Sequence, residues 1–242
     1  MQAVAIVPAA GLGVRLKSRQ SKPLVRIKGV PLIVYTLKAL SRHPQIKEVI
    51  VAANPLNIRA INSAIKKFRI SKVSKVVLGG ATRRISVENA LAAVADDTEL
   101  VLVHDAVRPF IRKGIISRVI GQAACCGAAV VGVPVKATIK KIAILNRPGG
   151  QTRLSGGQAA CGIVKETVDR HRLYEIQTPQ VFRKDLILKA YKKFGDRGVT
   201  DDSTLVERLG VKVALVLGSY DNIKITTPED LQVAEAILSR KA

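Results

Sequence analysis

Short, almost wholly apolar runs alternate along this chain with segments of helical periodicity, and no other feature constrains its fold as strongly. Strands that are apolar on both faces are typical of parallel sheets covered by helices. The sequence therefore predicts an α/β fold with a mainly parallel sheet and helices on both faces. In such sheets ligands bind beyond the carboxyl ends of the strands. The predicted strands are Ala3–Val7, Glu48–Ala53, Lys75–Leu78, Leu100–His104, Ala128–Val133 and Lys212–Leu217.

Helix start signals stand between these runs. Pro31 can open a helix, Asn54-Pro55 resembles an N-cap followed by a first-turn proline, and Thr227-Pro228 precedes two acidic residues at the start of a last helix. Ile58, Ile61, Ile65 and Phe68 fall on one face of the helix expected after Pro55. Further helices are expected near Ser86–Val94, Arg112–Ala124 and Lys184–Phe194.

The segment 136–165 interrupts the pattern. Thr138–Leu145 favours β-structure, and Asn146–Gly150 and Gly156-Gly157 are turn sequences. We expect one α/β domain over 1–242 from which 136–165 extends as a β-arm.

Charge is the unusual bulk property, with 40 Lys and Arg against 18 Asp and Glu and a formal net charge of +22. No acidic residue occurs between Val49 and Val87, where eight basic residues lie. A basic surface of this kind can bind nucleic acid, or phosphorylated substrates. Base-stacking platforms need aromatic side chains, and Phe68 stands alone among these cations. Nucleic acid is therefore the less favoured partner.

Membrane insertion and disulfide bonding are not expected. A bilayer span needs about 20 apolar residues, and the nearest run, Val119–Val135, is broken by glycines and Pro134. The apolar N-terminus lacks the basic leading segment of a signal peptide. Cys125, Cys126 and Cys161 are odd in number and have no metal-site spacing, which indicates a reducing cytoplasm.

The strongest local motif follows the first strand. Pro8–Arg15 combines small residues and glycines with a cation, and Lys22-Pro23 follows. Such a loop lets backbone N–H groups approach a phosphate closely. Leu16 stands where a dinucleotide-binding fingerprint needs glycine, and the P-loop pattern is absent as well. We expect phosphate binding by this loop, with Arg15 and Lys22 as its cations.

A second small-residue loop, Gly79–Ser86, follows a later strand. Its glycine pair, Arg83 and Ser86 can together hold a base or a ribose. Read alone, Ser86 is equally well explained as a helix N-cap.

The turn His104–Pro109 closes the fourth strand. A carboxylate there, beside phosphate-binding loops, suits a Mg²⁺ ion that bridges nucleotide phosphates, so Asp105 is the expected metal ligand. The alternative is an ion pair of Asp105 with Arg108 that shapes the turn. His104 is expected to be structural. Read alone, Arg170, Thr200 and Lys224 favour structural roles: a surface charge, a helix cap and an exposed lysine.

Taken together, six segments resemble the 2-C-methyl-D-erythritol 4-phosphate cytidylyltransferases of non-mevalonate isoprenoid biosynthesis. They occur in the family's order from Pro8 to Leu231. The segments are PAAGLGVRL with Lys22-Pro23, GGATRRISVENAL, VHDAVRPF, TPQVF, TDDSTLVE and DNIKITTPEDL.

The resemblance implies a Rossmann-like twisted sheet, CTP and a polyol phosphate as substrates, a divalent cation, and a homodimer built through the β-arm. It places Arg15 and Lys22 at the CTP phosphates, and Arg170 and Lys224 at the polyol phosphate, with Arg170 serving the neighbouring subunit's site. The CTP contacts it implies are Ala9, Ala10, Gly11, Gly13, Gly80 and Ser86, and the second small-residue loop adds Arg83. The residues it implies around the metal and the second substrate are Asp105, Arg108, Thr178 and Thr200, and Thr138 is a further expected substrate contact.

Two departures and two alternatives accompany this assignment. Ala137, before Thr138, replaces a usually acidic residue, and Asn146–Val164 is longer than usual for the family. The first alternative is a ribitol-5-phosphate cytidylyltransferase, although those enzymes typically begin the first loop with Ala-Gly-Gly. The second is a basic nucleic-acid-binding module that has kept an enzyme's fold.

Overall fold

The structure is a computed structural model, and it describes residues 1–11, 21–144, 162–194 and 201–240. The chain divides into two compact units. The first contains Met1–Gly132 and Ile176–Ala242, and the second is Val133–Glu175.

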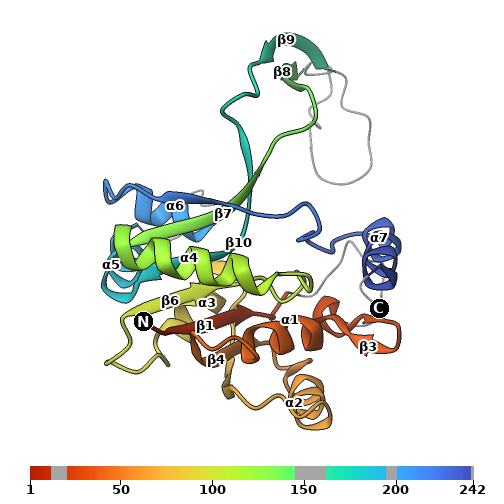
Figure 1. Ribbon diagram of the computed structural model, residues 1–242, viewed down its shortest axis with the longest axis vertical. Coiled ribbons are helices and arrows are strands. Elements are labelled where there is room, and N and C mark those ends of the chain that lie inside the picture. Colours follow the sequence, from red (N-terminus) through yellow and green to blue (C-terminus); the bar gives the residue numbers. More distant parts are fainter. Residues whose placement is uncertain (12–20, 145–161, 195–200, 241–242) are drawn as a thin grey trace, which may run out of the picture. The chain divides into compact units, whose positions relative to one another are not determined.

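A seven-stranded sheet forms the centre of the first unit (Figure 1). Its strand order is β11-β7-β10-β6-β1-β4-β5. Four neighbouring pairs are parallel, and β10 runs antiparallel to β6. The mainly parallel α/β fold predicted from the apolar runs is thereby confirmed. The strands are β1 (Ala3–Pro8), β4 (Ile46–Ala53), β5 (Val73–Leu78), β6 (Leu100–Val103), β7 (Ala128–Pro134), β10 (Tyr174–Arg183) and β11 (Ala214–Leu217).

Alternate side chains of the strands point to opposite faces of this sheet, and each face has its own hydrophobic core. Helices cover both cores. Ala5 and Val7 of β1 pack in one cluster of buried residues, and Val4 and Ile6 pack in another. The first core lies under α1 and α4, and the second is shared with α3, α5 and α6. The helices are α1 (Leu32–Ser41), α2 (Ile58–Lys67), α3 (Arg83–Leu91), α4 (Lys113–Cys126), α5 (Lys184–Phe194), α6 (Asp202–Glu207) and α7 (Pro228–Ser239).

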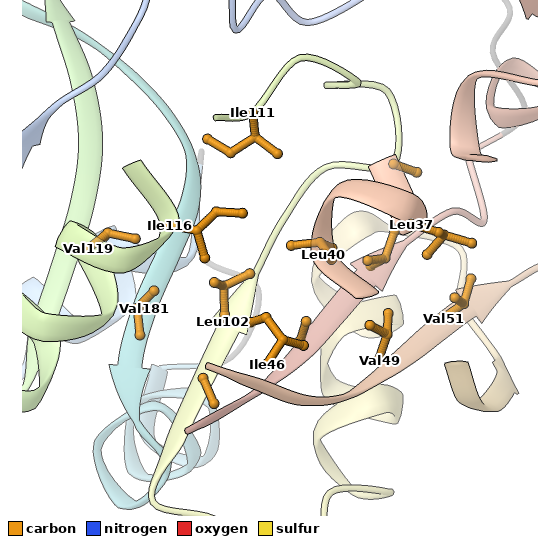
Figure 2. Close-up of a cluster of buried hydrophobic side chains, with 14 of the residues drawn as sticks. Leu37, Leu40, Ile46, Val49, Val51, Leu102, Ile111, Ile116, Val119 and Val181 are labelled. Atoms are coloured by element: carbon orange, nitrogen blue, oxygen red, sulfur yellow. The ribbon is translucent and has the colours of Figure 1, made fainter. Parts of the chain in front are cut away.

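Figure 2 shows the first core. Leu37 and Leu40 of α1 and Ile116 of α4 point toward Val49 and Leu102 of the sheet. All five side chains are almost fully buried. The scarcity of aromatic residues leaves this core to branched aliphatic side chains, which suit the pleated surface of strands.

A third cluster joins α7 to the hairpin of β2 (Arg26–Ile27) and β3 (Val30–Pro31). Thr227 caps α7: its hydroxyl accepts from the N–H of Asp230, while the Asp230 carboxylate accepts from the N–H of Thr227. The start signal identified in the sequence is therefore a reciprocal capping box.

Two predicted helix starts are wrong by about one turn. Asn54 Oδ1 accepts from the N–H groups of Leu56 and Asn57, so Asn54 closes a turn and α2 begins later, at Ile58. In the other case α3 begins earlier than Ser86, at Arg83, because Thr82 is its N-cap.

In the second unit, β8 (Ile139–Ile144) and β9 (Gly162–Val168) form an antiparallel pair. This agrees with the β-structure expected after Thr138. The predicted turns at 146–150 and 156–157 lie outside the described residues. Within the described ranges, no helix combines the length and the apolar character needed to cross a membrane.

Candidate active site

A cavity of about 940 Å³ opens where four parallel strands end. The segments that line it follow β1, β4, β5 and β6, which is the edge of the sheet where ligands are expected. Nine of the residues predicted for the site meet there: Ala9, Ala10, Gly11, Lys22, Gly80, Arg83, Ser86, Asp105 and Lys224.

Two asparagines brace the loop after β1. Asn54 Nδ2 donates to the carbonyl oxygen of Ala10 at 2.7 Å, and Asn57 Nδ2 donates to that of Ala9 at 2.9 Å. Asn57 also donates to Ser21 Oγ. The carbonyl oxygens of Ala9 and Ala10 are thereby occupied, and a Cβ at Gly11 would meet nothing within 4 Å. Gly13 and Arg15 lie outside the described residues.

The loop after β5 has no room for side chains. A Cβ at Gly80 would lie 2.1 Å from Ile85 Cγ2, and one at Gly79 would lie 2.7 Å from the Cβ of Ala10. Ser86 Oγ accepts from the N–H of Gly80 at 3.1 Å and donates to the carbonyl oxygen of Thr82 at 2.9 Å. Ser86 is not the N-cap of α3; it fixes the glycine loop against the first turn of that helix.

Asp105 lies at the centre of a cluster of cations. Its Oδ2 lies 2.9 Å from Lys224 Nζ and 3.3 Å from Arg108 Nε, and its Oδ1 lies 3.2 Å from Arg83 Nε. Burial would raise the pKa of Asp105, but the three positive charges outweigh burial and hold that pKa well below its ordinary value. The carboxylate is therefore ionised at neutral pH.

Thr178 of β10 fixes the backbone of Asp105. The N–H of Asp105 donates to Thr178 Oγ1 at 3.0 Å, and the Thr178 hydroxyl lies 3.0 Å from His104 Nδ1. His104 Nε2 lies 3.1 Å from the carbonyl oxygen of Arg108, which can only accept, so Nε2 carries the proton. Burial lowers the pKa of His104 to about 4, so this ring is neutral and structural, as expected. Arg108 and Thr178 thus lie behind Asp105, outside the lining of the cavity that the structure describes.

Asp202 and Tyr191 join the cluster from α6 and α5. Arg83 Nη1 donates to Asp202 Oδ2 at 2.7 Å, and the Tyr191 hydroxyl donates to Asp202 Oδ1 at 2.5 Å. Burial would lower the pKa of Arg83, but the charges of Asp202 and Asp105 raise it. Sequence reasoning missed both residues: Asp202 was given no role of its own within the segment TDDSTLVE, and Tyr191 lies in an ordinary amphipathic helix.

Besides Gly13, Arg15, Arg108 and Thr178, three further predicted residues are not among the described residues that line this cavity. Thr138 and Arg170 belong to the second unit, where a terminal nitrogen of Arg170 donates to the carbonyl oxygen of Lys136. Thr200 lies outside the described residues.

Among the described residues that line the cavity, Asp105 is the one carboxylate that could hold a metal ion. The described residues contain no group of three or more His, Cys, Asp or Glu side chains placed to hold a metal ion. Mg²⁺ commonly uses one or two carboxylates and completes its shell with phosphate oxygens and water. Asp105 fits such a role because a carboxylate accepts about four hydrogen bonds and three partners are present.

The arrangement suits chemistry at phosphorus. Lys22, Arg83 and Lys224 face one cavity beside two narrow backbone loops, and no described lining residue is a histidine or a cysteine. Fixed cations of this kind stabilise negative charge that develops on phosphate oxygens during transfer. The site therefore has the tools for transfer of a phosphoryl or nucleotidyl group without a side-chain nucleophile.

Comparison with known proteins agrees with this geometry. Residues 3–240 match the family model described as "IspD: 2-C-methyl-D-erythritol 4-phosphate cytidylyltransferase". The chain is 42% identical to the enzyme of that name from Caldanaerobacter subterraneus subsp. tengcongensis, over 99% of this chain and 100% of the relative. It is 40% identical to the Syntrophus aciditrophicus enzyme, over 98% and 96%.

A solved structure gives the same result for the fold. The 4-diphosphocytidyl-2C-methyl-D-erythritol synthase of Anaerococcus prevotii superposes with a TM-score of 0.80 at 32% identity, over 98% of this chain and 96% of that one. The family expected from the six sequence segments is confirmed. The chain belongs to the 2-C-methyl-D-erythritol 4-phosphate cytidylyltransferase family.

Proposed function

We propose that the cavity transfers the cytidylyl group of CTP to 2-C-methyl-D-erythritol 4-phosphate. The products are 4-diphosphocytidyl-2-C-methyl-D-erythritol and pyrophosphate, in non-mevalonate isoprenoid biosynthesis. The observation that carries this proposal is the convergence of Lys22, Arg83 and Lys224 on one cavity bordered by two glycine-containing loops.

The reaction is an in-line exchange at the α-phosphorus of CTP. An oxygen of the polyol phosphate forms a new P–O bond, and the bond to the bridging oxygen breaks, so that pyrophosphate leaves with the electron pair. The attacking phosphate is already ionised at neutral pH, so no general base is required. The protein's contribution is to hold the two anions in line and to stabilise the charge that builds up between them.

The residues divide between the two substrates. CTP contacts are assigned to Ala9, Ala10, Gly11, Gly13, Gly80, Arg83 and Ser86, with Arg15 and Lys22 stabilising the transition state. The polyol phosphate is assigned to Lys224 and Arg170, and Asp105, Arg108, Thr138, Thr178 and Thr200 are assigned to the second substrate and the metal. For Arg108 and Thr178 we infer an indirect role, since both bond to Asp105 from behind.

Asp105 would coordinate a divalent cation, for which Mg²⁺ is the first candidate. The cation would neutralise charge on the triphosphate when bound. Lys224 is the partner of Asp105 that can most easily turn away, because its side chain is 42% exposed and that of Arg108 only 11%. Lys224 is then available to the polyol phosphate.

Two further proposals concern the enzyme's assembly and surroundings. The second unit is assigned to a homodimer contact, supported by the exposed apolar side chains of Ile142, Ile163 and Val164 on its hairpin. The cytoplasm is the proposed location, supported by the exposed free thiols of Cys125 and Cys126, which persist in a reducing compartment.

Pyrophosphate release tests the function directly. The full chain with CTP, Mg²⁺ and 2-C-methyl-D-erythritol 4-phosphate should release pyrophosphate, and omission of any one of the three should abolish the release. Release that needs no polyol phosphate would contradict the proposal.

Ribitol 5-phosphate is the matched competitor. Measured beside it, 2-C-methyl-D-erythritol 4-phosphate should give the higher kcat/KM. A preference for ribitol 5-phosphate would reassign the substrate while leaving cytidylyl transfer in place.

A further inference from the structure

Arg83 is held between two buried carboxylates at the border of the cavity. Nη1 donates to Asp202 Oδ2 and Nε donates to Asp105 Oδ1. Asp202 is 2% exposed, whereas the side chain of Arg83 keeps 30% of its surface open and lines the cavity. A guanidinium carries five N–H donors. The two contacts therefore leave donors on both terminal nitrogens for a bound ligand.

The two acidic residues at the start of α6 have different partners. Asp201 caps the helix, with Oδ1 accepting from the N–H of Thr204, and its Oδ2 accepts from Gln180 of β10. Asp202 makes no such cap. Its two oxygens accept from Arg83 and from the Tyr191 hydroxyl. Asp201 is thus explained by the fold, whereas the contacts of Asp202 lead to the cavity.

Tyr191 fixes the orientation of Asp202. Burial, and secondly the charge of Asp202, raise the pKa of Tyr191, so its hydroxyl keeps the proton that it donates. With Oδ1 bound in this way, Oδ2 is the oxygen directed to Arg83. Arg83 in turn contacts Oδ1 of Asp105, and the Oδ2 of that carboxylate pairs with Lys224 and Arg108.

We propose that Asp202 and Tyr191 are positioning residues for CTP, acting through Arg83, whose remaining donors they direct into the cavity. The inference rests on the proposed function, since it takes CTP as the ligand. A free arginine side chain loses much conformational freedom when it is ordered. Arg83 loses this conformational freedom when the protein folds, before the nucleotide binds. Binding of CTP is therefore stronger, because the side chain is already ordered.

Calorimetric titration of the full chain with CTP is the test. Asp202→Asn removes the charge that holds Arg83 and should weaken CTP binding about tenfold, the size expected for a charged hydrogen bond. Tyr191→Phe removes one hydroxyl and should weaken it in the same direction by about threefold, as for a neutral hydrogen bond. The KM for the polyol phosphate at saturating CTP should stay within about twofold of the wild-type value, a change below RT in energy.

Glu207→Gln is the matched control. Glu207 lies on the same short helix, and its carboxylate accepts from Ser203 Oγ rather than from Arg83. This variant should bind CTP as the wild type does. A loss equal to that of Asp202→Asn would mean that any change in α6 disturbs the site, and would overturn the proposal.

A double-variant cycle separates positioning from general support of the fold. In an Arg83→Ala background, Asp202→Asn should cause no further loss of CTP affinity, because its effect passes through Arg83. Additive losses would overturn the proposal.

If Asp202→Asn fails to fold, as judged by urea unfolding, Tyr191→Phe takes its place in the cycle. A wild type that binds no CTP would instead contradict the proposed function, whereas unchanged affinity in both variants would overturn the positioning role alone.

Discussion

Lys224 Nζ lies 2.9 Å from Asp105 Oδ2, although the two residues are far apart in the sequence. Asp105 follows β6 and Lys224 precedes α7. The same carboxylate is paired with Arg83 and Arg108, so a single acidic side chain pairs with three cations, of which Arg83 and Lys224 line the cavity. Removing this carboxylate would leave positive charges in contact with one another.

Asp105→Asn should destabilise the protein. Loss of one member of a buried ion pair typically costs 3–5 kcal/mol. We expect about 3 kcal/mol at neutral pH, because Arg83 and Lys224 reach solvent and are partly screened. Urea unfolding followed by circular dichroism measures the difference. A free energy of unfolding equal to that of the wild type would show that the three cations do not depend on Asp105.

Lys22→Ala should lower turnover by two to three orders of magnitude, the size expected when one preorganised donor to a developing charge is lost. The fold should be retained, because a partly exposed cation contributes about 1 kcal/mol or less to stability. Steady-state pyrophosphate release measures the turnover. Lys28→Ala is the control, because Lys28 donates to Ser239 Oγ away from the cavity. Turnover retained in Lys22→Ala would remove Lys22 from the transition state.

Arg170→Ala should raise the KM for the polyol phosphate more than the KM for CTP, because the proposed role of Arg170 is to hold that phosphate. Arg172→Ala, two residues further and also exposed, is its control. An equal effect on both substrates would reject the positioning role.

Mixed protomers test whether sites are shared. If Arg170 serves the partner's cavity, co-refolding inactive Lys22→Ala with inactive Arg170→Ala should restore about a quarter of the wild-type activity per site in a random C₂ dimer. An inactive mixture that forms dimers by light scattering would indicate that each site is complete within one chain.

The stability of the protein should fall as the pH drops below about 6.5, the ordinary pKa of histidine. His43 is almost fully buried, and burial lowers its pKa, so the unfolded chain binds a proton in this range that the folded chain does not. Above pH 6.5 both states are neutral and the effect vanishes. His104 acts in the same direction.

His43→Gln should therefore reduce the slope of unfolding free energy against pH between about 6.5 and 5. The same slope in His43→Gln as in the wild type would mean that this ring is charged in the folded protein.

Much of the fold could be predicted because most of its strands are recognisable from their own residues. β1, β4, β6 and β7 are nearly all apolar, and such runs are typical of strands buried on both faces. β10 was missed. Its buried half contains Gln177, Thr178 and Gln180, whose polar groups bond to Ser219, Asp105 and Asp201. Those partners are distant in sequence, so no local pattern reveals that these residues belong in the middle of a sheet.

The residues that line the cavity could be identified from the sequence where they stand close together in one short loop. Small residues and cations after β1 and β5 are visible in the sequence, and they do line the cavity. Asn57, Asp202 and Tyr191 act through contacts with residues distant in the sequence. Asp202 follows a residue that is itself a good helix cap, and only coordinates show that its oxygens turn elsewhere.

The chain leaves the first unit at the end of β7 and re-enters it at β10, and these two strands are neighbours in the sheet. The polypeptide between them is thus inserted at a single seam. The length of this insert can change by duplication or deletion while every strand of the seven-stranded sheet keeps its neighbours. The insert can therefore change while the cavity of the first unit stays intact, and a chain that carries a relative's insert between β7 and β10 should fold.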